Sequence, residues 1–341
     1  MGDVRLEIEE ALAGGGGSAD GTAPHARRVP WAWLAAVAAV AALAAVVAVT
    51  LAARRPPDAR VLAFEVREPE GAVFELTTGG PALSPDGRML AFVGRTGAGA
   101  SLYLRPLDVT TARALPGTDG AQHPFWSPDS RSLGFFANGK LQKIGVAGDS
   151  GLPVVLCTAK DMKGASWSPK GLIVFAPDSN AGLSRVPDQG GEPQPVTQLD
   201  ATRKEISHRH PRFLPDGRHF LYLARLNDTF EHAVMVGSLE GSPPWELMRS
   251  PAAAEFASGH LFFLKDRNLL ARPFDAESLV FRGEAFPLVE EVTLLGSSAV
   301  FSASPAGILA YHTRRPTALR RRLVCRSRRS APRSAKRRPS T

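Results

Sequence analysis

The chain has 341 residues, 44% of them hydrophobic and 22% charged, so most of it can bury a core and is not disordered. Two cysteines exclude a disulfide framework and any metal cluster that needs several thiolates. The formal net charge is +8, but eleven Arg and one Lys, with no Asp or Glu, give residues 312–341 a charge of +12. Subtracting 12 from 8 leaves −4 for the rest, so the folded part is mildly acidic and does not favour nucleic-acid binding.

The first predicted element is a transmembrane helix over residues 30–53, a run of 24 positions without a charged side chain. About 20 apolar residues suffice to span a bilayer, and Trp31 and Trp33 suit the headgroup region at one end. Residues 1–29 precede it as a juxtamembrane linker that contains Gly14–Gly17. The length of the run and its distance from the N-terminus favour a retained anchor over a cleaved signal peptide or a buried core helix.

The helix is rich in alanine, which lets two such helices approach closely and so permits a homodimer. Arginines flank both of its ends. Large domains cross membranes largely regardless of such flanking charges, so the charge count leaves the membrane orientation open. A short linker over residues 54–62 follows the helix.

An internal repeat fills residues 63–311. Its core is Ser-Pro-Asp-Gly-Arg followed by an apolar run, as in Ser84–Phe92. Further copies lie at 127–135, 168–175 and 214–222, with two weaker ones at 257–263 and 304–311. The turn positions of the six copies are residues 87, 130, 171, 217, 259 and 307, which are 41 to 48 residues apart. A period of this length is typical of four-stranded propeller blades.

Each part of the repeat has a physical role. Asp-Gly between apolar runs indicates a tight hairpin turn, and the preceding Pro belongs at a strand end because it cannot donate to a ladder. Trp126, Trp167 and Phe213 lie two residues before that Pro, where each blade can bury an aromatic ring against its neighbour. Runs such as Leu90–Val93 and Leu172–Phe175 then form inner strands. The sequence therefore predicts an all-β fold, a β-propeller of about six four-stranded repeats with the last one incomplete.

These repeats resemble the TolB-type β-propeller repeat, a WD-like blade, best at Ser84–Phe92, Ser127–Phe135 and Leu214–Tyr222. The order of linker, transmembrane helix and propeller is similar to the C-terminal half of bacterial membrane serine/threonine protein kinases. Arg5–Leu12 resembles the end of such a kinase domain, so residues 1–29 would include its remnant. The resemblance implies a signal-transduction sensor, anchored by one span in the inner (cytoplasmic) membrane, with its propeller in the periplasm or outside the cell.

The kinase motifs are missing from this sequence. His208-Arg209-His210 lacks the Asp base of a kinase catalytic loop, and neither a Gly-rich loop with its lysine nor an Asp-Phe-Gly site is found. Gly148–Gly151 resembles the string around a trypsin-like serine nucleophile, but it lies between expected strands and is predicted to be a turn. We therefore expect a non-enzymatic chain without catalytic, cofactor-binding or metal-ligating residues. We expect its partner to be a protein, peptide or glycan that binds on the propeller face, and we expect no specific binding of a nucleic acid.

His208, His210 and Cys157 are residue types that can bind metals or react, and each is interpreted here as a structural residue. His208 and His210 are two positions apart, so on a strand they would share a face. Two histidines fall short of the three or four ligands of a zinc site, so a role at a strand edge is favoured. Cys157 follows an apolar run and is predicted to be a small buried residue.

Two other functions stay open: a stand-alone TolB-like envelope protein-interaction module, and a propeller accessory to a hydrolase. After Tyr311 the repeat pattern gives way to Arg, Ser, Pro and Ala. Residues 312–341 are predicted to form a disordered basic tail. Their composition is what a slip of the reading frame near His312 would produce.

Overall fold

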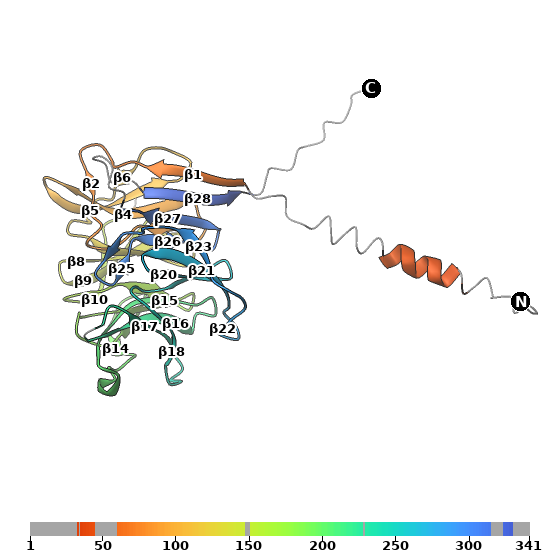
Figure 1. Cartoon of the computed structure of the whole chain (residues 1–341). Helices are drawn as coiled ribbons and strands as arrows, with labels where there is room; N and C mark the ends of the chain where they lie inside the picture. Colours follow the sequence, from red (N-terminus) through yellow and green to blue (C-terminus); the bar gives the residue numbers. More distant parts are fainter. Residues whose placement is uncertain are drawn as a thin grey trace, which may run out of the picture. The chain divides into compact units, whose positions relative to one another are not determined.

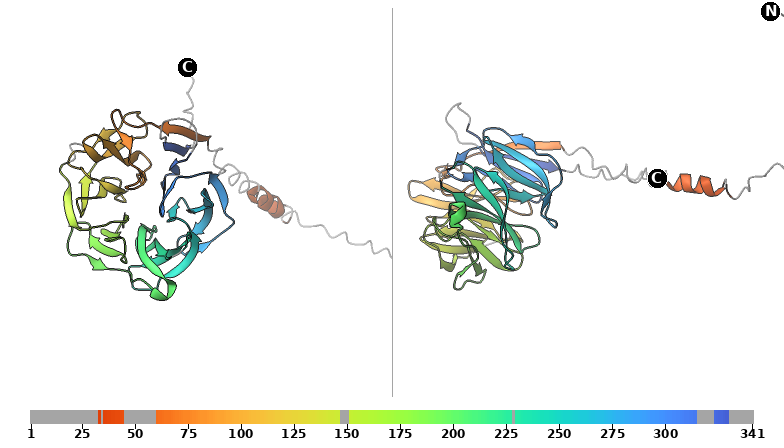
Figure 2. Two further views of the ribbon diagram at one scale, coloured as in Figure 1. Left: turned by 60° about the vertical axis from the view of Figure 1, so that its left-hand side comes forward. Right: turned by 60° about the horizontal axis from the view of Figure 1, so that its bottom comes forward.

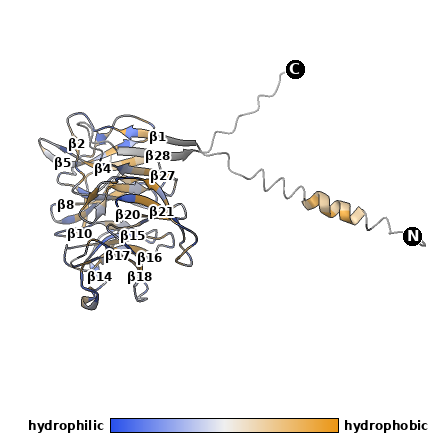
Figure 3. Cartoon of the chain, viewed as in Figure 1, coloured by the Kyte–Doolittle hydropathy of each residue, from blue (hydrophilic) through white to orange (hydrophobic). Residues whose placement is uncertain are grey.

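The computed structural model describes residues 33, 35–44, 60–146, 151–227, 229–314 and 323–329. The chain forms two compact units, residues 1–57 and 58–341. In the first unit the described residues are helical and apolar (Figures 1 and 3). Among the residues that the structure describes, no helix has the length and apolar character needed to cross a membrane. Most of the span predicted over residues 30–53, and all of residues 1–29, lie outside the described ranges.

The second unit is a β-propeller (Figure 2), and five of its blades are each built from consecutive strands. Blade 1 contains β2 (Val73–Phe74), β3 (Ala82–Leu83), β4 (Met89–Thr96), β5 (Gly99–Pro106) and β6 (Arg113–Ala114). Blade 2 contains β7 (Gln122–Trp126), β8 (Ser132–Ala137), β9 (Lys140–Gly145) and β10 (Val154–Thr158). Blade 3 contains β11 (Ala165–Trp167), β12 (Leu172–Phe175), β13 (Ser184–Pro187) and β14 (Gln194–Pro195).

A short 3₁₀ helix at Ala201–Arg203 leads into the next blade. Blade 4 contains β15 (Glu205–Phe213), β16 (His219–Leu226), β17 (His232–Ser238) and β18 (Trp245–Ser250). Blade 5 contains β19 (Glu255–Ala257), β20 (His260–Lys265), β21 (Asn268–Asp275), β22 (Val280–Phe281) and β23 (Phe286–Val289). Strands within each blade pair antiparallel, as the hairpin signals predict.

A sixth sheet, here called the closing sheet, joins the two ends of the propeller. It contains β26 (Phe301–Ala303), β27 (Ile308–His312), β28 (Leu323–Arg329) and β1 (Arg60–Val66). The two-residue strands β24 (Leu294–Leu295) and β25 (Ser298–Ala299) precede it as a small hairpin. Because β1 pairs along its whole length with β28, the beginning and the end of the propeller are held in one sheet.

The closing sheet corrects two predictions. Residues 323–329 were expected to belong to a disordered tail, and the last repeat was expected to be incomplete. Instead β28 pairs with β27 on one side and β1 on the other, which gives this sheet four strands. The physical reason is that β27 alone would expose a row of unpaired backbone groups, which Leu323–Arg329 satisfy. Residues 315–322 and 330–341 lie outside the described ranges.

The turn positions predicted from the repeat are confirmed. All six have left-handed backbone angles, with φ between +61° at Ser130 and +80° at Gly307. In blade 1 the amide of Gly87 donates to the carbonyl of Ser84 at 2.8 Å, and the carboxylate of Asp86 accepts from the next-but-one amide at 3.0 Å. Glycine adopts positive φ without a steric cost, and Asp stabilises its own turn, so this dipeptide recurs at the hairpins.

The aromatic residues before the turns pack between blades, as predicted. The Trp126 ring lies in an apolar cluster with Leu102 of blade 1, and its Nε1 donates to the Ala82 carbonyl at 2.9 Å. Trp167 of blade 3 packs in the same way with Phe125 of blade 2. The core is therefore a series of apolar layers between neighbouring sheets, and it holds the innermost strands around a central channel.

Candidate functional site

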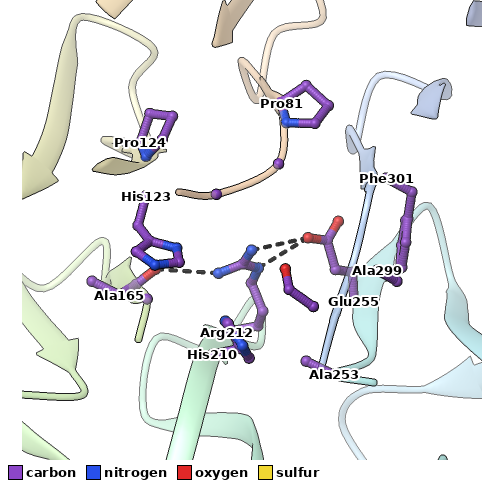
Figure 4. Close-up of a pocket in the computed structure, with 14 residues that line it drawn as sticks. Pro81, His123, Pro124, Ala165, His210, Arg212, Ala253, Glu255, Ala299 and Phe301 are labelled. Carbon is purple, nitrogen blue, oxygen red and sulfur yellow. Dashed lines mark hydrogen bonds and ion pairs between the residues drawn. The ribbon is translucent and has the colours of Figure 1, made fainter. Parts of the chain in front are cut away.

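The innermost strands surround a small cavity of about 50 Å³ in the channel (Figure 4). All five blades and the closing sheet contribute to its wall. Its lining residues are Gly79, Gly80, Pro81, His123, Pro124, Gly164, Ala165, His210, Arg212, Ala253, Glu255, Ser298, Ala299 and Phe301. We call this the channel cavity. The propeller thus brings together side chains that are far apart in the sequence.

The lining residues occupy equivalent places in successive repeats. His123, Gly164 and His210 each lie seven residues before the turn positions 130, 171 and 217. His123, Arg212 and the glycines of the channel cavity are not among the residues predicted from the sequence. A signal was present, because the dipeptide His-Pro occurs at the same phase in blades 2 and 4, at residues 123–124 and 210–211.

Local distortions of the inner strands turn both histidines toward the channel. His123 and His210 have left-handed φ angles of 47° and 50°. The register of β7 against β8 shifts between Gln122 and Phe125, and that of β15 against β16 shifts between Arg209 and Arg212. Such bulges interrupt the alternation of side chains across a strand and re-aim one of them.

The bulge in β15 overturns the prediction that His208 and His210 share a face. His210 lines the channel cavity, whereas the His208 ring is buried away from it. Its Nε2 lies 2.9 Å from a Glu205 carboxylate oxygen and its Nδ1 lies 2.7 Å from the Thr197 hydroxyl. These bonds satisfy both ring nitrogens between blade 4 and the segment that follows β14 of blade 3, so His208 has a structural role.

Glycines let neighbouring blades meet closely at the channel. The His123 amide donates to the Thr78 carbonyl at 2.7 Å, and the His210 amide donates to the Lys163 carbonyl at 2.8 Å. A Cβ atom at Gly79 would lie 2.8 Å from the Cα of His123, which is closer than such atoms pack. Backbone thus approaches backbone at this contact, and only glycine leaves room for it.

The ion pair between Arg212 and Glu255, together with one further hydrogen bond at each of the two side chains, links four sheets across the cavity wall. The Nη2 atom of Arg212 lies 3.0 Å from Oε1 of Glu255, and its Nη1 donates to the Ala165 carbonyl at 3.2 Å. The other carboxylate oxygen of Glu255 accepts from the Ala303 amide at 2.9 Å. The Arg212 side chain is 37% exposed, against 12% for Glu255. Its guanidinium can therefore still meet a ligand in the channel.

The two channel histidines are held in the neutral form. Burial, reinforced by the charges of Lys163 and Arg212, lowers the pKa of His123 to about 4. Burial and the nearby His123 ring lower the pKa of His210 well below its usual value. The ring centroids are 6.1 Å apart. At neutral pH the cavity therefore presents two uncharged imidazoles, which can donate and accept hydrogen bonds, beside one charged pair.

No group of three or more His, Cys, Asp and Glu side chains within the described ranges could hold a metal ion. The arrangement is that of a hydrogen-bonding recess. Of the Gly148–Gly151 string, only Gly151 lies inside the described residues, so the turn expected there stays a prediction.

The prediction for Cys157 is confirmed, since the side chain is buried among apolar residues between blades 2 and 3. Burial, with a smaller contribution from Glu192, raises the pKa of its thiol to about 11.

The thiolate is the reactive form of a cysteine side chain. We expect Cys157 of the folded C325S chain to react with a disulfide reagent at pH 8 at least tenfold more slowly than after unfolding in urea. Equal rates would show that the thiol is exposed.

Part of the chain is similar in sequence to a known protein. No protein-family profile matches the chain. The uncharacterized peptidase YuxL of Bacillus subtilis (strain 168) is 32% identical over 181 residues, which covers 46% of this chain and 25% of YuxL. The matched region is thus a quarter of that relative's length.

Two solved structures have a similar architecture. TolB from Acinetobacter baumannii superposes with a TM-score of 0.50 at 16% identity, covering 71% of this chain and 68% of TolB. A chain of a nidogen/laminin complex superposes with a TM-score of 0.50 at 11% identity, covering 66% and 85% of the two chains. The TolB-like β-propeller predicted from the repeats is therefore confirmed as a fold. The resemblance to membrane kinases stays a prediction.

Proposed function

We propose that this chain is a non-enzymatic protein-interaction module whose channel cavity receives a peptide segment of a partner protein. The observation that carries the proposal is the convergence of all six sheets on one recess lined by Arg212, Glu255 and two neutral imidazoles. A volume of about 50 Å³ admits a single extended side chain and not a folded domain. Polar groups held on a rigid scaffold recognise such a side chain without a loss of their own freedom.

The favoured side chain is one that both donates and accepts hydrogen bonds. The guanidinium of Arg212 can donate to a carbonyl or carboxylate oxygen, and the neutral rings of His123 and His210 can accept from an amide. Asparagine and glutamine combine both groups in one side chain. We therefore expect partner peptides to place an amide-bearing or acidic residue at the channel, with apolar residues on either side.

The module would be attached to the inner membrane and serve as the sensor portion of a receptor-type serine/threonine kinase. Support comes from the uncharged run over residues 30–53 and from the order of linker, apolar segment and propeller. In the described part of that run, Val37, Val40 and Leu43 are all exposed. An apolar stripe of this kind needs a lipid or protein partner. In such a receptor the propeller would lie outside the cytoplasm, and binding would bias the pairing of two spans.

A test uses the full chain in detergent micelles to select binders from a random-peptide library. The R212Q variant should bind the selected peptides at least tenfold more weakly, because a charge-assisted hydrogen bond is lost. The control is R218A, since Arg218 lies beside the turn at residue 217 and is 47% exposed. Thermal unfolding of both variants shows whether the fold is kept. Equal affinity of R212Q and the wild type would refute binding at the channel.

A second candidate function is a propeller that presents substrates to a hydrolase, and the match to the peptidase YuxL favours it. The two functions differ in what happens to a bound peptide. Selected peptides can be incubated with membranes from cells that contain or lack this chain, and their cleavage followed by mass spectrometry. Cleavage that depends on the chain would favour the hydrolase accessory, whereas intact peptides would favour the sensor.

A further inference from the structure

A second recess lies between blade 5, the closing sheet and blade 1, and it shares no lining residue with the channel cavity. Its volume is about 280 Å³, near the lower end of the range of small-molecule sites. Three leucines form its apolar wall: Leu76, Leu294 and Leu295. Two arginines, Arg267 and Arg314, provide its charge. We call it the arginine recess.

The charges of the arginine recess are not balanced. The described residues that line it include no carboxylate. The exposed Arg314 side chain has no hydrogen-bond or ion-pair partner among the described residues. Among the described residues, the Arg267 side chain pairs with Glu291 alone, at 4.0 Å between two side chains that are 45% and 59% exposed. Such a pair contributes little and gives way readily to a better partner.

The backbone holds the wall in place before any ligand arrives. The Thr293 amide donates to the His312 carbonyl at 2.8 Å, and the Arg314 amide donates to the Glu291 carbonyl at 3.1 Å. The Thr293 hydroxyl also lies 2.8 Å from Nδ1 of His312. These bonds tie the strand end that carries Arg314 to the segment that carries Leu294 and Leu295. A site organised in advance binds its ligand with a smaller entropy cost.

Arg267 occupies an unfavourable backbone position. It lies at the tip of the β20–β21 hairpin, where Asp266 and Arg267 both have positive φ, 49° and 65°. Glycine or asparagine would fit such a turn with less strain. The carbonyl of Arg267 is fixed by the Val292 amide at 3.0 Å. A bulky cation kept in a strained turn beside a recess is consistent with a functional role.

We propose that the arginine recess binds a carboxylate attached to a compact branched apolar group, either as a free acid or as the C-terminus of a peptide. The guanidinium groups of Arg267 and Arg314 pair with the carboxylate oxygens, a geometry that suits arginine better than lysine. The leucines cover the apolar group and exclude water from the pair. Thr77 and His312 also line the recess.

The test is isothermal titration calorimetry of the full chain in detergent micelles with N-acetyl-L-leucine. N-acetyl-L-leucinamide is the matched probe, with the carboxylate replaced by an amide. We expect the acid to bind at least tenfold more tightly than the amide, and R267A and R314A each to weaken acid binding at least tenfold. The control R282A removes an exposed arginine of blade 5 that does not line the recess and should bind like the wild type.

A second arm separates the two sources of the carboxylate. A hexapeptide ending in leucine is compared with the same peptide amidated at its C-terminus. Tighter binding of the free-acid peptide than of N-acetyl-L-leucine identifies a peptide C-terminus, whereas exclusion of the peptide identifies a free acid, and both support the carboxylate site. Equal binding of acid and amide, no binding of any probe, or full affinity in R314A would overturn the proposal. R212Q should leave this binding unchanged, which separates it from the channel cavity.

Discussion

Gly79→Ala is expected to lower the free energy of unfolding by about 3 kcal/mol or more. Gly79 has a φ of +126°, which side chains with a Cβ rarely adopt. Its new Cβ would lie 2.8 Å from the Cα and 2.9 Å from the backbone nitrogen of His123. Because these are backbone atoms, relief requires blade 2 to move away from blade 1. That movement would also weaken the hydrogen bond from the His123 amide to the Thr78 carbonyl.

Urea unfolding of the full chain, followed by circular dichroism, measures the effect. Gly97→Ala is the matched control in blade 1, because a Cβ there meets nothing within 4 Å, and it should change stability by about 0.5 kcal/mol or less. Gly164→Ala is a second test, since its Cβ would lie 3.0 Å from the His210 ring, and its cost should fall between the two. Gly79→Ala with wild-type stability would mean that the two blades do not meet as described.

Acidification from pH 7 to pH 5 is expected to destabilise the propeller by several kcal/mol. Burial and neighbouring cations lower the pKa of His123 and of His232 to about 4, and burial also lowers the pKa of His210 well below its usual value. The unfolded chain binds these protons near pH 6.5, so between pH 6.5 and 4 it holds more protons than the folded chain. The stabilisation is complete above pH 6.5 and is lost as the pH falls. Each histidine can contribute at most about 2 kcal/mol between pH 6.5 and 5.

Unfolding midpoints in urea at pH 7 and pH 5 measure this loss. Carboxylates whose pKa is lowered, such as Glu205 and Asp216, lose their contribution only below about pH 4.5, outside this window. H123Q should reduce the pH dependence because it removes one titrating group. Stability that is unchanged down to pH 5 would contradict the neutral state assigned to the channel histidines.

The repeat pattern allowed much of the fold to be predicted. Asp-Gly at residues 86–87 and 216–217 placed the turns, because few dipeptides other than this one combine positive φ with side-chain capping. The apolar run Leu172–Phe175 coincides with β12. These features depend on interactions between residues that are close in sequence, which the pattern contains directly.

Strand β28 could not be predicted in this way. Leu323–Arg329 contains three arginine residues and has the composition of a basic tail. Its pairing depends on two strand edges, those of β27 and of β1, which are more than 200 residues apart in the chain. A local pattern carries no information about such a partner.

The channel cavity was missed for a related reason. Strict alternation along β15 would place His208 and His210 on one face. Because of the bulge between Arg209 and Arg212, His210 lines the channel cavity whereas His208 is buried away from it. Likewise, the need for glycine at residue 79 arises from the approach of His123 in the next blade. Both features depend on how neighbouring blades meet, and only the phase of the His-Pro dipeptides hints at them in the sequence.

The most direct test of peptide binding at the channel is a nuclear magnetic resonance titration of the full chain labelled with ¹³C at histidine, using a library-selected peptide. Binding at the channel should give the largest shifts at His123 and His210, which line the channel cavity, and none at His219 and His260, which lie beside the turns at residues 217 and 259. The opposite pattern, with shifts at His219 or His260 and unchanged signals from the channel histidines, would contradict it.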